Sequence, residues 1–212
     1  MKEVVIISGG DISEGLILEH INKEKEKIII AVDKGLESLH NINVNPDYII
    51  GDFDSVSKDI LDKYSNTELV KLNPIKDFTD THMALKLAID LKADTITILG
   101  ATGKRIDHAL ANINIMKEAL EKDIKCKMID THNEIQLINS YTELEKNTKY
   151  KYISLIPLTN KAEGITLKGF KYLLNNATLN IGHSIGVSNE QVDDIASINV
   201  SGGILILIKS ID

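Results

Sequence analysis

The first 130 residues alternate short, almost entirely apolar segments with segments that carry a helical repeat. The apolar segments have the composition of strands that are covered on both faces of a sheet. The predicted strands are Val4–Ile7, Ile28–Val32, Tyr48–Ile50, Glu68–Leu72, Thr95–Leu99 and Lys125–Asp130. Alternation of strands with helices predicts an N-terminal α/β domain with a mainly parallel, doubly wound sheet. Ligands of such sheets bind beyond the carboxyl ends of the strands.

Three of the intervening segments place apolar residues at helical spacing. SEGLILEHINKEK follows the first strand, and its Ser13 is a good N-cap residue. THMALKLAIDL and RIDHALANINIMKEAL follow later strands. The predicted apolar faces are Leu16, Ile17 and Ile21; Met83, Leu87 and Leu91; and Ile106, Leu110, Ile113, Met116 and Leu120.

The rhythm changes after residue 130. Short extended runs such as NEIQLINS, KYKYISLIPL, EGITLKGF and GILILIKS are separated there by Asn, Gly and Ser, without a long helical repeat. This pattern predicts an all-β C-terminal domain, either an antiparallel sandwich or a small barrel. We therefore expect domains at residues 1–130 and 131–212.

Charge and cysteine content narrow the class of partner. A net charge of -7 argues against nucleic-acid binding, which needs surplus Lys and Arg. We expect no signal segment in MKEVVIISGG, and no apolar run reaches the length of a membrane span. The single cysteine, Cys126, excludes an internal disulfide, and we expect it to be an inert buried thiol. These features favour a soluble, cytoplasmic protein.

Two turns that follow strands carry residues suited to a nucleotide. Gly9 and Gly10 in SGG would let backbone amides approach a phosphate beside a helix N-terminus, although a plain tight turn has the same sequence. Asp33 in AVDKG could accept hydrogen bonds from a ribose or a base, or it could cap the next helix.

The stretch YIIGDFDSVS ends a strand with two acids. If the chain stays extended, Asp52 and Asp54 point to the same side. Two carboxylates roughly 5 Å apart repel by about 3 kcal/mol at an effective dielectric constant of about 20. A hard cation such as Mg²⁺ would offset this repulsion. The alternative is a simple turn in which Ser55 or Ser57 caps the following helix.

The stretch NPIKDFTDTHMAL crowds acids at the start of a helix. Asp77, Thr79 and Asp80 are favourable there as caps or as partners of the helix dipole. Capping leaves Asp80 available to face the same site as the two acids of the preceding motif. Lys76 could meet an anion.

The most informative stretch is ILGATGKRIDHALANI. Gly103, Lys104 and Arg105 precede a helix N-terminus, a combination that suits a polyphosphate, and Arg105 can hold a phosphate through two parallel bonds. Asp107 could bind a metal or cap its helix. His108 is more often structural than catalytic at such a position. Acids, a metal and an arginine around one phosphoryl group indicate phosphoryl transfer or phosphate hydrolysis.

Taken in order, these motifs resemble the thiamine pyrophosphokinase family. The matching stretches are Ser8–Gly10, Val32–Gly35, Gly51–Ser55, Lys76–Asp80, Lys104–His108 and Gly182–Glu190, followed by GGILILIKS. The resemblance covers essentially the whole chain. Three positions depart from the family pattern: Lys34 and Lys104 replace common glycines, and Ile204 stands where some relatives have an aromatic residue.

The resemblance implies transfer of pyrophosphate from ATP to the hydroxyethyl group of thiamine, giving thiamine diphosphate and AMP. It implies that Asp52, Asp54 and Asp80 bind Mg²⁺ and, with Arg105, form the catalytic set. The residues it assigns to ATP are Gly9, Gly10, Asp33, Lys76, Asp77, Thr79, Gly103, Lys104, Asp107 and His108. The residues it assigns to thiamine are Ser188, Asn189 and Ile204. It further implies a homodimer with the active site at the subunit interface.

Three other functions remain open from sequence. A haloacid dehalogenase-type phosphatase also places Asp-x-Asp after an apolar strand, and an acid pair occurs at Asp193 and Asp194. A non-catalytic nucleotide-binding module would need the glycines and cations but not three convergent acids. A pyrophosphokinase acting on another alcohol, such as a pterin, would release AMP as well.

Overall fold

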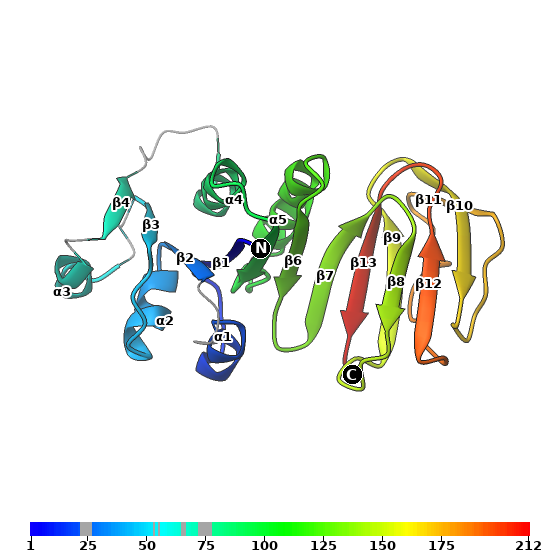
Figure 1. The fold of residues 1–212 in the computed structure, drawn as a ribbon, viewed down its shortest axis with the longest axis horizontal. Coiled ribbons are helices and arrows are strands. Elements are labelled where there is room, and N and C mark those ends of the chain that lie inside the picture. Colours follow the sequence, from blue (N-terminus) through cyan, green and yellow to red (C-terminus); the bar gives the residue numbers. More distant parts are fainter. Residues whose placement is uncertain (22–26, 53, 55, 65–66, 72–77) are drawn as a thin grey trace. The chain divides into compact units, whose positions relative to one another are not determined.

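The computed structural model describes residues 1–212 except 22–26, 53, 55, 65–66 and 72–77. The chain divides into two compact units, Met1–Thr131 and His132–Asp212 (Figure 1). Within the described residues, no helix is both long enough and apolar enough to cross a membrane.

The N-terminal unit is built on a parallel sheet. Its strands are β1 (Glu3–Ile7), β2 (Lys27–Val32), β3 (Tyr48–Gly51), β4 (Glu68–Lys71), β5 (Thr95–Leu99) and β6 (Lys125–Ile129). They lie in the order β4-β3-β2-β1-β5-β6, and every neighbouring pair is parallel. This strand order and pairing confirm the predicted parallel α/β sheet. The prediction was possible because strands buried on both faces have near-continuous runs of Val and Ile.

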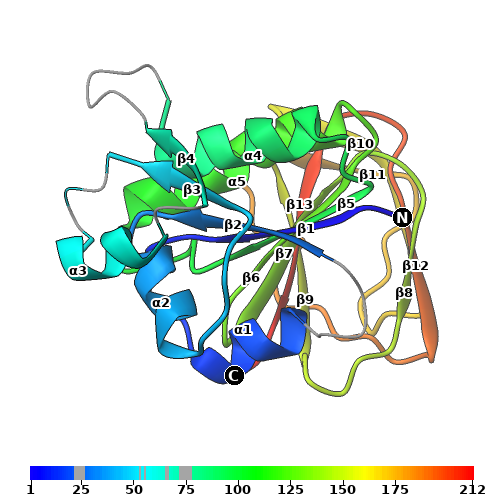
Figure 2. The same ribbon diagram turned by 60° about the vertical axis from the view of Figure 1, so that its left-hand side comes forward.

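Helices cover both faces of this sheet (Figure 2). They are α1 (Glu14–His20), α2 (Gly35–Asn41), α3 (Lys58–Leu61), the 3₁₀ turn η1 (Asp62–Tyr64), α4 (Asp80–Asp90) and α5 (Ile106–Leu120). Helices α4 and α5 pack against each other on one face, and α1 and α2 lie on the other. The core on the side of α1 and α2 includes Ile17, Ala31, Leu36 and Leu39.

The first helix begins as the sequence predicts. Ser13 is its N-cap residue, and the Ser13 hydroxyl accepts a hydrogen bond from the Leu16 N–H at 3.3 Å. Leu16 and Ile17 are buried on the predicted face. Ile21 follows the last turn and is only partly buried.

The predicted apolar faces of the other two helices are largely wrong. In α4 the buried residues are Thr81, Ala84, Leu85 and Ala88 rather than Met83, Leu87 and Leu91. In α5 only Met116 of the predicted face is fully buried, together with Asn112 and Ala119. Ile106 is 74% exposed and Leu110 is 56% exposed. Small side chains let these two helices lie close to their neighbours, so Ala and Thr occupy the tightest contacts that spacing alone assigns to larger residues.

The C-terminal unit is an antiparallel sandwich. Its strands are β7 (Asn133–Ile138), β8 (Thr142–Glu145), β9 (Tyr152–Pro157), β10 (Lys161–Lys168), β11 (Ala177–Asn180), β12 (Ile195–Asn199) and β13 (Leu205–Ser210). One sheet has the order β7-β13-β9 and the other β11-β10-β12-β8. Leu155 and Leu207 of the first share a core with Ile165 and Ile198 of the second. This arrangement confirms the predicted sandwich.

Candidate active site

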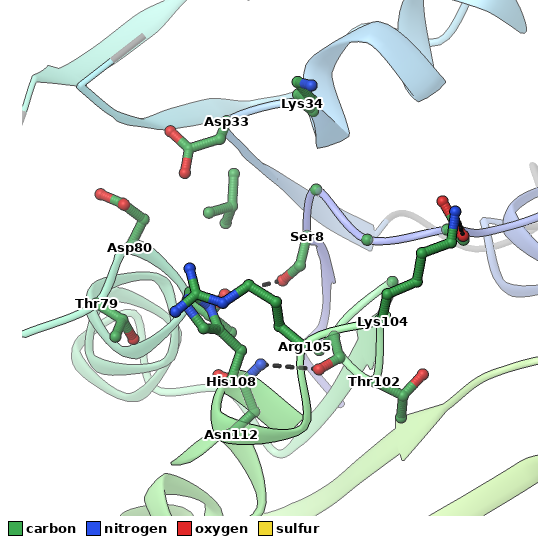
Figure 3. Close-up of a pocket in the computed structure, with 18 residues that line it drawn as sticks. Ser8, Asp33, Lys34, Thr79, Asp80, Thr102, Lys104, Arg105, His108 and Asn112 are labelled. Atoms are coloured by element: carbon green, nitrogen blue, oxygen red, sulfur yellow. Dashed lines mark hydrogen bonds and ion pairs between the residues drawn. The ribbon is translucent and has the colours of Figure 1, made fainter. Parts of the chain in front are cut away.

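A cavity of about 380 Å³ opens at the carboxyl edge of the parallel sheet (Figure 3). Loops after β1, β2 and β5 form one part of its wall, and the first turns of α4 and α5 form the other. The lining residues are 8–11, 32–34, 79–81, 100–105, His108 and Asn112. The switch point of a doubly wound sheet lies between strands whose connections run to opposite faces, and β1 and β5 flank this cavity in that way.

Two glycine turns make backbone contact inside the cavity wall. The Gly10 N–H donates to the Gly100 carbonyl oxygen at 2.8 Å. A Cβ atom built on Gly10 would lie 2.4 Å from that oxygen, and Gly100 has a φ of +67°. The SGG and GATG sequences therefore need glycine for close approach of the loops, and this contact places Gly9, Gly10 and Gly103 at the cavity.

Asp33 lies at the end of β2 and lines the cavity with Lys34. The N-cap position of α2 belongs to Lys34, so Asp33 is not the capping residue of that helix. A Cβ atom on Gly51 would lie 2.1 Å from Asp33 Oδ1. The glycine that precedes Asp52 on the neighbouring strand β3 thus leaves the space that the Asp33 carboxylate occupies.

The first turn of α4 carries three lining residues. Thr79 is the N-cap and its hydroxyl accepts from the His82 N–H at 3.3 Å, which confirms the capping role predicted for this segment. Asp80 follows as the first helical residue, and the buried Thr81 hydroxyl lies 3.1 Å from the Ser8 hydroxyl. Figure 3 shows Asp80 and Asp33 on the same side of the cavity. Lys76 and Asp77 lie outside the described residues.

The loop before α5 supplies two cationic side chains to the cavity. Lys104 and Arg105 line the cavity, and the Lys104 ammonium lies 3.2 Å from an Asp11 carboxylate oxygen. Arg105 donates two hydrogen bonds to Asp107, at 3.2 Å from Nε and 2.5 Å from an Nη. This pairing lowers the pKa of Asp107 to about 2 and raises the pKa of Arg105. Asp107 does not line the cavity but binds the lining residue Arg105, whereas His108 is itself a lining residue.

Asp52 and Asp54 lie beyond the end of a strand rather than within it. Strand β3 ends at Gly51, and the Asp54 N–H donates to Asp52 Oδ1 at 3.1 Å. The expected continuation of the strand through both acids is therefore wrong, and neither residue lines the cavity. Within the described parts of the chain, no three acids, histidines or cysteines gather closely enough to hold a metal ion. Ser57 is the N-cap residue of α3 without a side-chain cap bond, and Ser55 is not described.

Sequence reasoning missed three buried polar residues at this site. Ser8 and Thr81 are joined by their hydroxyl groups in the cavity wall, and Asn112 is 5% exposed with its Nδ2 donating to the Ala101 carbonyl oxygen at 2.8 Å. A signal for Asn112 was present, because it follows the lining residue His108 by one helical turn.

The three residues assigned to thiamine lie in the C-terminal unit. Ser188 has a φ of +60°, and its N–H donates to the Ser154 hydroxyl at 3.0 Å. Asn189 is 7% exposed, and its side-chain amide exchanges two hydrogen bonds with the backbone of Tyr172, at 3.0 and 2.7 Å. Ile204 is partly buried in the turn before β13. Asn189 thus holds the segment around Tyr172 beside Ser188.

The fold and the cavity define a class of two-unit protein, in which a parallel α/β unit with glycines and cations around its cavity is followed by an antiparallel sandwich. Two family profiles match these units in the same order. The profile "Thiamin pyrophosphokinase, catalytic domain" matches residues 20–128, and "Thiamin pyrophosphokinase, vitamin B1 binding domain" matches residues 141–205.

Individual relatives are thiamine pyrophosphokinases that match this chain over its full length. The chain is 35% identical to the thiamine pyrophosphokinase of Bacillus subtilis, with all of both chains covered. The crystal structure of a thiamine pyrophosphokinase from Bacillus subtilis superposes with a TM-score of 0.91 at 33% identity, covering 100% of both chains. A thiamin pyrophosphokinase structure from Geobacillus thermodenitrificans gives 0.88 at 28% identity, covering 99% of this chain and 98% of that one. The chain belongs to the thiamin pyrophosphokinase family.

Proposed function

We propose that this protein transfers an intact pyrophosphate group from ATP to the hydroxyethyl oxygen of thiamine, giving thiamine diphosphate and AMP. The observation that carries the proposal is the end-to-end match to thiamine pyrophosphokinases, which includes both the α/β unit with its cavity and the sandwich. ATP serves as the pyrophosphate donor in this proposal, and we place the enzyme in the cytoplasm.

The cavity of the α/β unit is the ATP site in this proposal. Gly9, Gly10 and Gly103 let the backbone approach the phosphates, and Lys104 and Arg105 supply positive charge. Asp33 lies at the end of a strand next to the glycine turn, a position suited to a ribose hydroxyl. Thr79 and His108 complete the wall. Lys76 and Asp77 are proposed as further contacts from sequence alone, and Asp107 acts by orienting Arg105.

We further propose that Mg²⁺ binds between phosphate oxygens of ATP and the carboxylates of Asp52, Asp54 and Asp80, because these described acids do not by themselves gather closely enough to hold the ion. Their donor atoms fit a hard cation, because carboxylate oxygens and phosphate oxygens are the ligands that Mg²⁺ prefers. Asp80 lines the cavity, and Asp52 follows Gly51, whose backbone abuts the lining residue Asp33. A bound Mg²⁺ would offset the charge of the ATP phosphates.

The chemistry requires alignment more than a reactive side chain. The hydroxyethyl oxygen of thiamine forms a bond to the β-phosphorus, the bond from the β-phosphorus to the α–β bridging oxygen breaks, and AMP leaves. Arg105, Lys104 and the loop N–H groups stabilise the charge that develops on phosphate oxygens. The alcohol proton passes to Asp80 or Asp54, or to a phosphate oxygen of ATP. Positioning of the two substrates supplies most of the remaining rate gain.

The thiamine site in this proposal involves the C-terminal unit and a second copy of the chain. Ser188 and Ile204 contact thiamine, and Asn189 positions Ser188 and Tyr172. The active site is completed at the interface of a homodimer. Because thiamine is a cation, the acidic balance of the protein, with a net charge of -7, favours its approach.

A haloacid dehalogenase-type phosphatase is not favoured. The acid pair Asp193 and Asp194 lies in the C-terminal unit, where the Asp194 carbonyl oxygen accepts from the Lys146 N–H at 2.8 Å, and the full-length match is to thiamine pyrophosphokinases. A phosphatase would also trap a phosphoryl group on Asp52 and release inorganic phosphate.

Phosphorus NMR of a reaction with ATP, Mg²⁺ and thiamine tests the proposal. We expect AMP and a thiamine-linked diphosphate to appear in equal amounts. ADP with thiamine monophosphate, or free phosphate without a thiamine ester, contradicts the proposed transfer. If AMP forms with a different alcohol and not with thiamine, the proposed pyrophosphate transfer stands, but thiamine is refuted as its acceptor.

A further inference from the structure

Asn112 is a buried polar residue that the proposed reaction does not use. It lies in the second turn of α5, is 5% exposed, and lines the cavity together with His108 one turn earlier. Asn is mostly exposed in proteins, and a buried one generally has a bonding role. Its hydrogen bond runs to the loop that precedes the helix, from Nδ2 to the Ala101 carbonyl oxygen at 2.8 Å.

Chemistry fixes the orientation of this side chain. A carbonyl oxygen only accepts hydrogen bonds, so the Asn112 atom that faces Ala101 must be the NH₂ group. The Ala101 carbonyl is therefore drawn toward α5. In a planar trans peptide, the next N–H points opposite to the carbonyl, so the Thr102 N–H is turned away from Asn112.

The loop around this peptide is fixed on its other side as well. The carbonyl oxygens of Leu99 and Gly100 accept from the N–H groups of Ser8 and Gly10, each at 2.8 Å. Within the described part of the chain, the N–H groups of Thr102, Gly103 and Lys104 donate no hydrogen bond, although all three residues line the cavity. Carbonyls bound to the protein and N–H groups left for a ligand are the arrangement of an anion-binding loop.

We propose that Asn112 is a positioning residue for phosphate binding: its amide holds the Ala101–Thr102 peptide so that the N–H groups of residues 102–104 face the phosphates of ATP. The inference rests on the proposed ATP site. Asn112 itself makes no bond to the reacting atoms.

Three substitutions separate this role from simple packing. Asn112→Leu removes the donor and keeps the volume. Asn112→Asp keeps the shape, but the carboxylate repels the Ala101 carbonyl, whereas the protonated carboxyl can donate to it. Burial raises the pKa of the introduced carboxyl group above its ordinary value of about 3.9. Asn114→Asp is the matched control, because Asn114 also donates its Nδ2 to a backbone carbonyl, that of Leu110 at 2.7 Å, but is exposed and outside the cavity.

Equilibrium binding of ATP with Mg²⁺, measured by calorimetry from pH 8 to pH 5.5, supplies the readout. Every dissociation constant is divided by the wild-type value at the same pH, which cancels the titration of ATP and of the native groups. The charged and titratable residues that line the cavity are Asp11, Asp33, Lys34, Asp80, Lys104, Arg105 and His108.

At pH 8 we expect both Asn112 variants to weaken ATP binding about tenfold, the effect of one lost hydrogen bond to the loop. As the pH falls, the ratio for Asn112→Asp should return toward one, while the ratio for Asn112→Leu stays constant and Asn114→Asp stays near one throughout. Wild-type ATP binding by Asn112→Leu at pH 8, or a ratio for Asn112→Asp that rises as the pH falls, overturns the inference. If the protein forms no thiamine diphosphate yet shows this pattern, the proposed function fails and the role of Asn112 in phosphate binding stands.

Discussion

Replacing Gly10 by alanine tests the claim that two backbones meet at the candidate ATP site. The added methyl carbon would lie 2.4 Å from the Gly100 carbonyl oxygen and 3.3 Å from Gly103 Cα. Neither neighbour is a flexible side chain that could rotate away. The loops must separate, which also breaks the 2.8 Å hydrogen bond from the Gly10 N–H to Gly100.

The expected cost follows from these two terms. Forcing an extra methyl group into a packed contact costs about 1–3 kcal/mol, and losing one backbone hydrogen bond costs about 0.5–1.5 kcal/mol. Gly10→Ala should therefore lower the free energy of unfolding of the N-terminal unit by about 1.5–4.5 kcal/mol. The same displacement moves the loop before α5, so ATP should bind at least about tenfold more weakly.

Gly15→Ala is the matched control five residues along the chain. A methyl group on Gly15 would meet no atom within 4 Å apart from its chain neighbours and the backbone of its own helix α1. Alanine should stabilise that helix by about 0.5–1 kcal/mol and leave ATP binding unchanged. Urea unfolding and ATP calorimetry on both variants check the prediction. If Gly10→Ala is as stable as the wild type and binds ATP equally well, the close contact of the two loops is refuted.

Three further outcomes follow from individual side chains. Asp52→Asn keeps an oxygen that can accept from the Asp54 N–H but removes the negative charge. Turnover should therefore fall at least about a hundredfold, while the melting temperature stays within experimental error. Wild-type turnover by this variant would refute the role of Asp52 in metal binding. The carboxyl group of Asp107 should titrate near pH 2 by NMR because Arg105 binds it, so the ion pair is intact from pH 5 to 8 and is lost only as the pH falls through about 2. Arg105→Ala should raise the titration midpoint of Asp107 to about 3.9. An unchanged midpoint would exclude the pairing. Burial raises the pKa of Cys126 to about 12, so native protein at pH 8 should not react with iodoacetamide, and unfolding in urea should expose it; rapid labelling of folded protein would contradict that burial.

The sheets could be predicted from sequence because strand signals are strong where both faces are buried. Runs such as VVII and KIIIAV leave little choice of structure, and their ends fall within one residue of the observed strands. Strand β8 was missed, since TELE contains a single buried apolar residue, Leu144. A polar edge segment of this kind pairs because its neighbour offers a register, which one sequence segment does not reveal.

The site was predicted in its elements but not in its geometry. The glycine turns, Asp80 and Arg105 were found because parallel strand ends meet at one edge of the sheet. The turn at Asp52 and Asp54 was mistaken for a continued strand, since a hydrogen bond between an acid and a backbone N–H two residues on competes with extension. Asn112 was overlooked because its burial depends on the Ala101 carbonyl, a partner fixed by tertiary structure.

The position of an isotopic label tests the central claim most directly. ATP labelled at the β-phosphorus, incubated with the enzyme, Mg²⁺ and thiamine, should pass the label to the thiamine ester and leave AMP unlabelled. ATP labelled at the γ-phosphorus should label the same thiamine diphosphate to the same extent. Label from the γ-position alone in the thiamine product, with the β-label retained in ADP, would contradict transfer of an intact pyrophosphate.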